Sequence, residues 1–149
     1  MIMALLAASA FISDTQAQAI VAGCATHAAA KRHSFAIAVV DPGGQLVAFR
    51  RMGGNSFGAG DFSIQKARAA AAWGTSTSEL TDWLRDAPGL VGAPHFAPVA
   101  GGVPIFAKDG AMLGAAGASG EEPVDDEQCV KAGVAAAGLL SEPPASGGK

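Results

Sequence analysis

Hydrophobic residues recur every three or four positions from Ala17 to Ala28, and polar residues occupy the places between them. This spacing is typical of a helix that buries one face. Ser13 and Gln16 stand just before the pattern at the spacing of a capping box, in which each side chain bonds to the other residue's backbone amide. We therefore expect the folded part of the chain to open with a helix from about Ser13.

Helix-start signals and apolar spacing predict three further helices. One begins at Asp61 or Ser63 and runs through Ala72, a short one runs from a second capping box at Ser76–Glu79 to about Asp86, and a last one is capped by Asp125. Lys66 and Arg68 would lie near the start of the first of these, where positive charge opposes the helix dipole. This cost indicates that one of the two cations is held there for a partner.

Two pairs of apolar runs flank short turn sequences, which is the pattern of β-hairpins. These are 35–40 with 45–52, and 103–107 with 111–118. Lys108-Asp109-Gly110 separates the second pair, and an Asp-Gly turn is a strong hairpin signal. The last run is almost entirely glycine and alanine, so we expect a helix, a second subunit or a flat ligand to approach its backbone closely.

The elements follow one another as helix, hairpin, helix, helix, hairpin, helix. This order predicts an α+β sandwich, with a single antiparallel sheet of about five strands and helices packed on it. Residues 13–140 are expected to form one domain. Residues 1–12 form an apolar N-terminal arm, and the polar, Pro/Gly-rich residues 141–149 are expected to be a disordered tail.

The charge and hydrophobicity of the chain limit its partners. The 149 residues carry a formal net charge of −3, which argues against nucleic acid. No apolar run approaches the ~20 residues of a membrane-spanning helix. The apolar start lacks a basic segment, and cleavage at the signal-like Ala17-Gln18-Ala19 would cut the first helix, so a cytoplasmic protein is expected. Cys24 and Cys129 are interpreted as buried thiols in a reducing compartment.

Several common chemistries fit the sequence poorly. The glycines near Gly120 lack the spacing of phosphate-binding loops, and the acidic residues that follow would repel phosphate. The histidines and cysteines lack zinc-site spacing apart from Cys24 with His27, so no metal site is predicted. Ser119 has no nucleophile-elbow sequence around it and fits a turn hydrogen bond better.

Arg51 and Lys66 are the strongest candidates for binding an anion. Arg51 ends a strand and Lys66 begins a helix, so they could converge on a carboxylate at one edge of the sheet. A surface salt bridge with Asp61 is an equally good interpretation. Haem iron has nominal ligands in His27, His33, His95 and Met52, each with an ordinary structural alternative.

Four segments, in this order, resemble the GlcG/HbpS-type family of small haem-binding or haem-degrading proteins, which includes the C-terminal domain of PduO-type corrinoid adenosyltransferases. They are AVVDPGGQLVAFRRM, QKARAAAAWGTSTSEL, GGVPI and GAAGASGEEPVDDEQCVKAG. The resemblance implies a profilin-like domain that assembles into dimers or larger rings. The positions that match the family's motifs are Asp41, Gly44, Arg51, Met52, Lys66, Gly101, Gly102, Pro104, Ser119, Gly120 and Asp126.

The sequence departs from the family pattern at two positions. Glu121 stands where the family usually has glycine, which puts an extra charge at the rim of the pocket. Gly53 stands where the family usually has an acid.

The resemblance and the residues together leave three functions open. The first is binding of haem or another tetrapyrrole, with degradation as an additional activity, Arg51 and Lys66 on the propionates and His95 as a candidate iron ligand. The second is a cofactor-independent enzyme acting on a small carboxylate or carbonyl metabolite at a subunit interface. In that case Lys66 and Arg51 bind the substrate and Glu122 or Asp126 serves as acid or base. The third is a structural or regulatory oligomer. The expected ligand-binding residues are Gly101, Gly102, Pro104, Ser119, Gly120 and His95.

Overall fold

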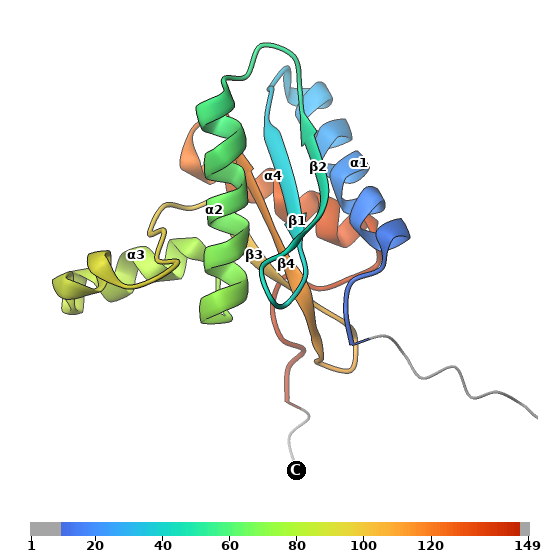
Figure 1. The fold of residues 1–149 in the computed structure, drawn as a ribbon. Coiled ribbons are helices and arrows are strands. Elements are labelled where there is room, and N and C mark those ends of the chain that lie inside the picture. The colour runs from blue at the N-terminus through green and yellow to red at the C-terminus, as the bar shows by residue number, and fades with distance from the viewer. Residues whose placement is uncertain (1–9, 147–149) are drawn as a thin grey trace, which may run out of the picture.

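The computed structural model describes residues 10–146 (Figure 1). Its elements are α1 (Asp14–Lys31), β1 (Ala36–Val40), β2 (Leu46–Arg51), α2 (Phe57–Trp73), α3 (Thr77–Asp86), the short 3₁₀ helix η1 (Pro88–Gly92), β3 (Gly102–Phe106), β4 (Met112–Ser119) and α4 (Pro123–Ala136). The predicted α+β class and the order of elements are confirmed.

One antiparallel sheet runs through the domain in the strand order β2-β1-β4-β3. The described residues form four strands in place of the expected five or so. Leu140 adds only an isolated bridge to Phe106 at the β3 edge. The central pair, β1 and β4, comes from different hairpins, so the sheet joins the two halves of the chain.

Helices cover both faces of the sheet (Figure 1). Helix α2 packs on one face against Ala38, Val40 and Ala115. Helices α1 and α4 pack on the other face, where they enclose the larger core with Ile37, Val39 and residues of β3 and β4. The sheet is therefore buried between two layers of helices, and α3 projects away from it.

The Gly/Ala strand is β4, and the element that approaches it is helix α2. A Cβ at Gly117 would lie 2.3 Å from the carbonyl oxygen of Ser63 and 2.6 Å from the amide nitrogen of Ala67. Only glycine permits so close an approach of helix and strand backbones. The expected close contact is thus made by a helix of the same chain.

The N-terminal caps of three helices can be compared with those that the sequence predicts. The Ser13–Gln16 capping box is present with both reciprocal bonds. Ser76 caps α3, but the Glu79 carboxylate bonds to the Thr75 hydroxyl, so the second predicted box lacks its return bond. Helix α4 begins at Pro123 after Glu122, and the expected cap at Asp125 is wrong because proline suits the first helical position.

Helix α2 begins at Phe57, capped by Ser56, about a turn earlier than the predicted Asp61 or Ser63. Gly58 and Gly60 suggest a loop in the sequence, but Gly60 is helical and buried under the ring of Phe49. Because of this earlier start, Lys66 lies in the middle of the helix. The predicted conflict between Lys66 and the helix dipole is therefore wrong.

Cys24 and Cys129 form a disulfide that joins α1 to α4, so the interpretation of two buried free thiols is wrong. The helices meet closely there, because a Cβ at Gly133 would lie 2.3 Å from the carbonyl oxygen of Ile20. Disulfides are typical of oxidising compartments. The expectation of a cytoplasmic protein thereby loses the argument that rested on reduced thiols.

The chain ends lie only partly within the described structure. Residues 1–9 of the apolar arm and residues 147–149 of the tail lie outside it. Ile12, the last residue of the arm, is buried, and its amide donates to the Leu113 carbonyl at 2.8 Å. Among the helices that the structure describes, none has the length and apolar character needed to cross a membrane.

Candidate functional site

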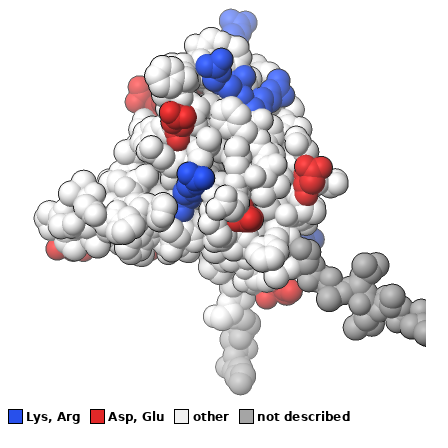
Figure 2. Space-filling view, viewed as in Figure 1, with Lys and Arg blue, Asp and Glu red and all other residues white. Residues whose placement is uncertain are grey.

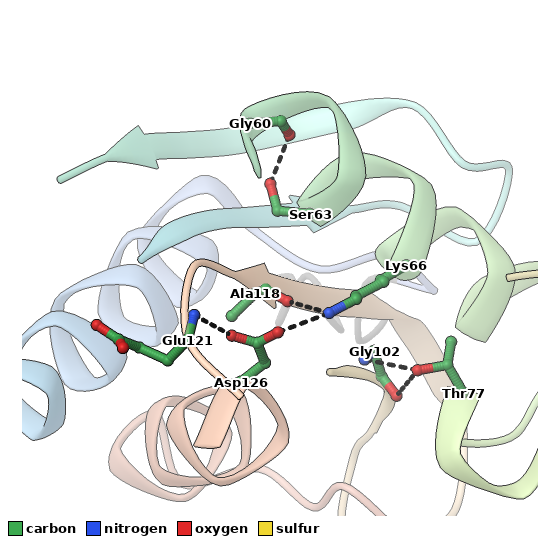
Figure 3. A network of polar contacts seen from close by, with 8 residues as sticks. All are labelled: Gly60, Ser63, Lys66, Thr77, Gly102, Ala118, Glu121 and Asp126. Carbon is green, nitrogen blue, oxygen red and sulfur yellow. Dashed lines mark hydrogen bonds and ion pairs between the residues drawn. The ribbon is translucent and has the colours of Figure 1, made fainter. Parts of the chain in front are cut away.

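Lys66 and Asp126 form a buried ion pair at the end of β4 (Figure 3). The Lys66 Nζ lies 2.7 Å from the Asp126 Oδ2 and donates to the carbonyl oxygen of Ala118 at 3.1 Å. It also lies 4.7 Å from the centre of the Phe62 ring. The Asp126 Oδ1 accepts from the Glu121 amide at 3.1 Å. Each charge is thus surrounded by partners from its own chain.

Glycines make room for this pair beside the sheet. A Cβ at Gly101, whose φ is +129°, would lie 2.7 Å from both the Lys66 Nζ and the Ala118 carbonyl oxygen. A Cβ at Gly102 would lie 2.3 Å from the Lys66 carbonyl oxygen, and the Gly102 amide donates to the Thr77 hydroxyl at 2.9 Å. The two glycines that the resemblance marks as ligand-binding therefore lie against the ion pair.

Burial dominates the electrostatics of the pair. Desolvation lowers the pKa of Lys66, and the hydrogen bond and charge of Asp126 oppose that shift. Desolvation raises the pKa of Asp126, and Lys66 and the amides of Glu121 and Gly120 oppose that shift. The side chains are only 1% and 3% exposed. The arrangement connects α2 to α4 and has no open side for a ligand.

Ser119 and Arg51 share one row of the sheet near this pair. Ala36 of β1 pairs with Ser119 on one side and with Arg51 on the other. Ser119 is buried and Arg51 is exposed at the edge strand. Neither Arg51 nor Lys66 forms an ion pair with Asp61 in the part of the chain that the structure describes.

The other predicted site residues lie apart. Glu122 is exposed as the cap of α4. Pro104 lies in the middle of β3 and lines a cavity of about 350 Å³ with Thr75, Lys131 and Glu142. His95 lies in the loop after η1. The predicted set therefore divides into the ion-pair cluster of Lys66, Asp126, Gly101, Gly102 and Gly120, a sheet row, and scattered positions, and no described cavity unites them.

Glu121, one of the two departures from the family pattern, has a local partner. Its carboxylate accepts from the amide of Ser34 at 3.0 Å, and the Ser34 hydroxyl donates to the carbonyl of Gly53. Gly53 is the second departure. These bonds link the start of β1 to the segments that follow β2 and β4. Glu121 thus fastens three segments together at this end of the sheet.

His33 and Met52 both pack on Phe35. The His33 ring lies edge-on to the Phe35 ring at 5.7 Å, and its Nδ1 is buried without a hydrogen-bond partner. The Met52 sulfur accepts from the Phe35 amide at 3.5 Å. His27 is half-buried on α1. These contacts give His33 and Met52 a packing role.

His95 is exposed and lies beside open space. It lines a cavity of about 380 Å³ with the β1–β2 turn and the outer face of α2, and an adjoining one of about 300 Å³. Arg68 lines both cavities as well. We call the two together the His95 groove. Its lining residues are Pro42, Gly43, Gly44, Gln45, Gln65, Arg68, Ala71, Ala72, Ala93, His95, Phe96 and Ala97.

The backbone of His95 is held in an unusual conformation. Its φ is +55°, in the left-handed region, and its carbonyl accepts from the Trp73 indole nitrogen at 3.2 Å. The Trp73 ring also packs edge-on to Phe96 and to Trp83. Left-handed residues other than glycine need such support, because the conformation costs about 1–3 kcal/mol. The loop therefore presents the His95 imidazole at the exposed rim of the groove.

Sequence reasoning counted Arg68 only as one of two helix cations, either of which could be held for a partner, and did not name it as a site residue. The sequence placed it beside Lys66 at a helix start, where the dipole argument applied to both. The available signal was helical spacing, because Ala71 and Ala72 follow Arg68 at the three- and four-residue spacing that puts them on one face. Among residues 10–146, no three or more His, Cys, Asp or Glu side chains gather where they could hold a metal ion.

Known proteins are similar to this chain in sequence and in fold. The family model described as "Haem degrading protein HbpS-like" matches residues 12–135. Protein GlcG of Escherichia coli K12 is 35% identical over 109 residues, which are 72% of this chain and 81% of GlcG.

Solved structures agree with this assignment. A double mutant of Streptomyces reticuli HbpS superposes with a TM-score of 0.80 at 30% identity, covering 91% of this chain and 92% of that one. A PduOC–haem complex superposes with a TM-score of 0.80 at 22% identity, covering 89% and 99%, and shows the shared fold. From the extent of the family match and the identity to GlcG, the chain belongs to the HbpS-like family.

Proposed function

We propose that this protein binds haem or a related tetrapyrrole in the His95 groove. The observation that carries the proposal is that His95 and Arg68 line the same groove, beside small residues of the β1–β2 turn and α2. Imidazole is a common axial ligand of haem iron. Gly43, Gly44 and Ala71 leave this side of the groove without bulky side chains, which suits a flat ring.

The donor set of the groove fits the group. His95 supplies a nitrogen ligand, Phe96 an aromatic edge, and Arg68 a positive charge for a carboxylate. The ring would supply iron chemistry, and the chain would supply the ligand and the surroundings. The family includes HbpS, described as haem-degrading, and the fold occurs in a PduOC–haem complex. These relatives support a tetrapyrrole as the class of ligand, and the residues that bind it are inferred from this chain.

The buried ion pair takes a different role in this proposal from the one the sequence suggested. The expected contact of Lys66 with a propionate would require breaking its bond to Asp126. Four cavities of about 300 to 470 Å³ lie among residues 10–146, and neither Lys66 nor Asp126 lines them. The same point weighs against the enzyme hypothesis, in which Lys66 binds a substrate. We therefore assign the pair to the scaffold and the ligand to the groove.

We further propose that the protein is a homo-oligomer that uses α3 as a contact. Figure 1 shows α3 projecting from the body, and only Thr77 and Leu80 of its residues are buried. Nearby Val91 is 68% exposed. α3 carries Glu79, Asp82 and Asp86, and Lys and Arg gather at the top of the molecule in Figure 2. An acidic, partly apolar arm fits the basic end of a second copy.

A haemin titration of the purified apo-protein tests the binding proposal. We expect a saturable Soret shift at one haemin per chain, which His95→Ala abolishes while His27→Ala and His33→Ala keep it. A shift that never saturates, or one that all three variants keep, would overturn the assignment. Bleaching of the bound Soret band over time in the same samples would report degradation.

Light scattering after size exclusion tests the oligomer. We expect the wild type to exceed the mass of one chain and Val91→Asp to reduce it. Ala22→Asp, a matched change on the exposed face of α1, should leave the mass unchanged. A monomeric wild type contradicts the proposal directly.

A further inference from the structure

We propose that Arg68 binds a carboxylate of the ligand, so that the His95 groove selects tetrapyrroles with free carboxylates over neutral ones. This inference rests on the proposed function. It adds a residue outside the family's matching positions and a chemical criterion that haem binding alone does not give.

The β1–β2 turn holds the Arg68 side chain in place. Its Nε donates to the carbonyl oxygen of Gly44 at 2.9 Å. Gly44 has a φ of +79° in the β1–β2 turn, and a Cβ there would lie 3.5 Å from the Arg68 Cγ. The turn therefore lies along the aliphatic part of the side chain and fixes the plane of the guanidinium. An arginine oriented in this way loses less conformational freedom when it binds.

The two terminal nitrogens of the Arg68 guanidinium are available to a ligand. Among residues 10–146, Arg68 takes part in none of the ion pairs, and its hydrogen bond to Gly44 uses only Nε. The two terminal nitrogens thus have no partner in the described chain. They form the fork that matches the two oxygens of a carboxylate. Arg68 is exposed on α2, so a ligand in the groove can reach them.

The groove carries a positive charge from Arg68. Arg68 is the one arginine or lysine among the residues that line these two cavities, and none of them is an aspartate or glutamate. Asp41, in the adjoining turn, directs its Oδ1 to the amides of Gly43 and Gln45 at 2.9 and 3.0 Å. Gln45 and Gln65 are neutral. The positive charge is therefore not cancelled by a lining side chain, and it complements one carboxylate of a ligand whose ring faces His95.

The test compares haemin with haemin dimethyl ester, in which both carboxylates are blocked. We expect wild type to bind haemin about tenfold more tightly than the ester, as one charge-assisted contact at an exposed site suggests. Arg68→Gln should bind haemin as weakly as wild type binds the ester, with the ester unaffected. Lys108→Gln, which changes an exposed cation in the β3–β4 turn outside both the groove and α3, should preserve the preference.

The outcomes separate the two proposals. If wild type binds haemin saturably but Arg68→Gln keeps the full preference over the ester, the Arg68 inference is wrong and haem binding stands. If wild type binds neither compound saturably, both fail. The preference should also shrink as salt is raised from low to about 0.5 M, because screening weakens an exposed ion pair. A preference that salt does not change contradicts a carboxylate–guanidinium contact.

Discussion

Lys66 and Asp126 meet at 2.7 Å although their helices, α2 and α4, cover opposite faces of the sheet. The contact passes beside the end of β4, where Gly101 leaves space for the lysine side chain. Figure 3 shows the two side chains converging below Ala118. The pair thus links the two helical layers directly.

Removing one partner of this pair should strongly destabilise the fold. Lys66→Met leaves Asp126 buried without its counter-charge, which we expect to cost about 3–5 kcal/mol in the free energy of unfolding. The double variant Lys66→Met/Asp126→Asn keeps an acceptor for the Glu121 amide and should lose less. Urea denaturation measures all three proteins. A double variant that is less stable than the single one would refute this account.

The pair should also give stability an unusual dependence on pH. Burial raises the pKa of Asp126 above 3.8, so the stability gained by protonating it is present below that pH and lost as pH rises through its folded pKa. Burial lowers the pKa of Lys66 below 10.5, so stability is regained between its folded pKa and that value. The difference in the free energy of unfolding between the wild type and the double variant should therefore be smallest between the two folded pKa values. Urea unfolding at stepped pH checks this, and a maximum there would contradict it.

Reduction of the Cys24–Cys129 disulfide should lower stability by about 2–5 kcal/mol, since it removes a constraint on the unfolded chain. Thermal unfolding with and without dithiothreitol measures the effect. Cys24→Ala/Cys129→Ala should unfold like the reduced wild type in both conditions. Two thiols that react in unreduced, denatured protein would show that the bond had not formed.

Gly117→Ala should be among the most damaging single substitutions on β4. The new methyl group would lie 2.3 Å from the Ser63 carbonyl oxygen, so α2 must move off the sheet. We expect a loss of about 3 kcal/mol or more, in the range of severe overpacking. Gly53→Ala is the matched control, because nothing lies within 4 Å of its Cβ. Equal melting temperatures for the two variants would show that helix and strand are not in backbone contact.

Trp73→Phe should weaken haemin binding without removing it. Phenylalanine keeps much of the aromatic packing with Phe96 but loses the bond to the His95 carbonyl. The loop would then sample conformations in which His95 points elsewhere, which costs affinity in proportion to the competent fraction. We expect a severalfold rise in the haemin Kd with an unchanged Soret maximum. A shifted maximum would mean that Trp73 affects the iron ligand itself.

Local signals were enough to predict most of the elements. The Lys108-Asp109-Gly110 turn and the Ser13 capping box depend on neighbours in the chain, and both are present as expected. The start of α2 was missed because Gly58 and Gly60 suggest a loop, whereas in the fold the missing Cβ of Gly60 leaves room for the ring of Phe49 on β2. Sequence patterns carry little information about such contacts.

The candidate site was harder to predict for the same reason. Lys66 and Asp126 were both singled out, but 60 residues separate them and nothing local indicates that they pair. Arg68 was named with Lys66 but not chosen as a site residue, because its significance depends on its bond to Gly44 in the β1–β2 turn. The disulfide was missed because a single pair of cysteines 105 residues apart has no diagnostic spacing.

The bond between Cys24 and Cys129 encloses every strand, the second and third helices, and the loop of His95 in one covalent ring. A protease that cut the exposed backbone around Pro94 and His95 would therefore open the ring without releasing a fragment. The nicked protein would migrate as a single species on a non-reducing gel and separate into two pieces only after reduction. Cleavage would cut the loop that carries His95 beside the groove, and the disulfide would still hold the two halves of the sheet in one covalent molecule.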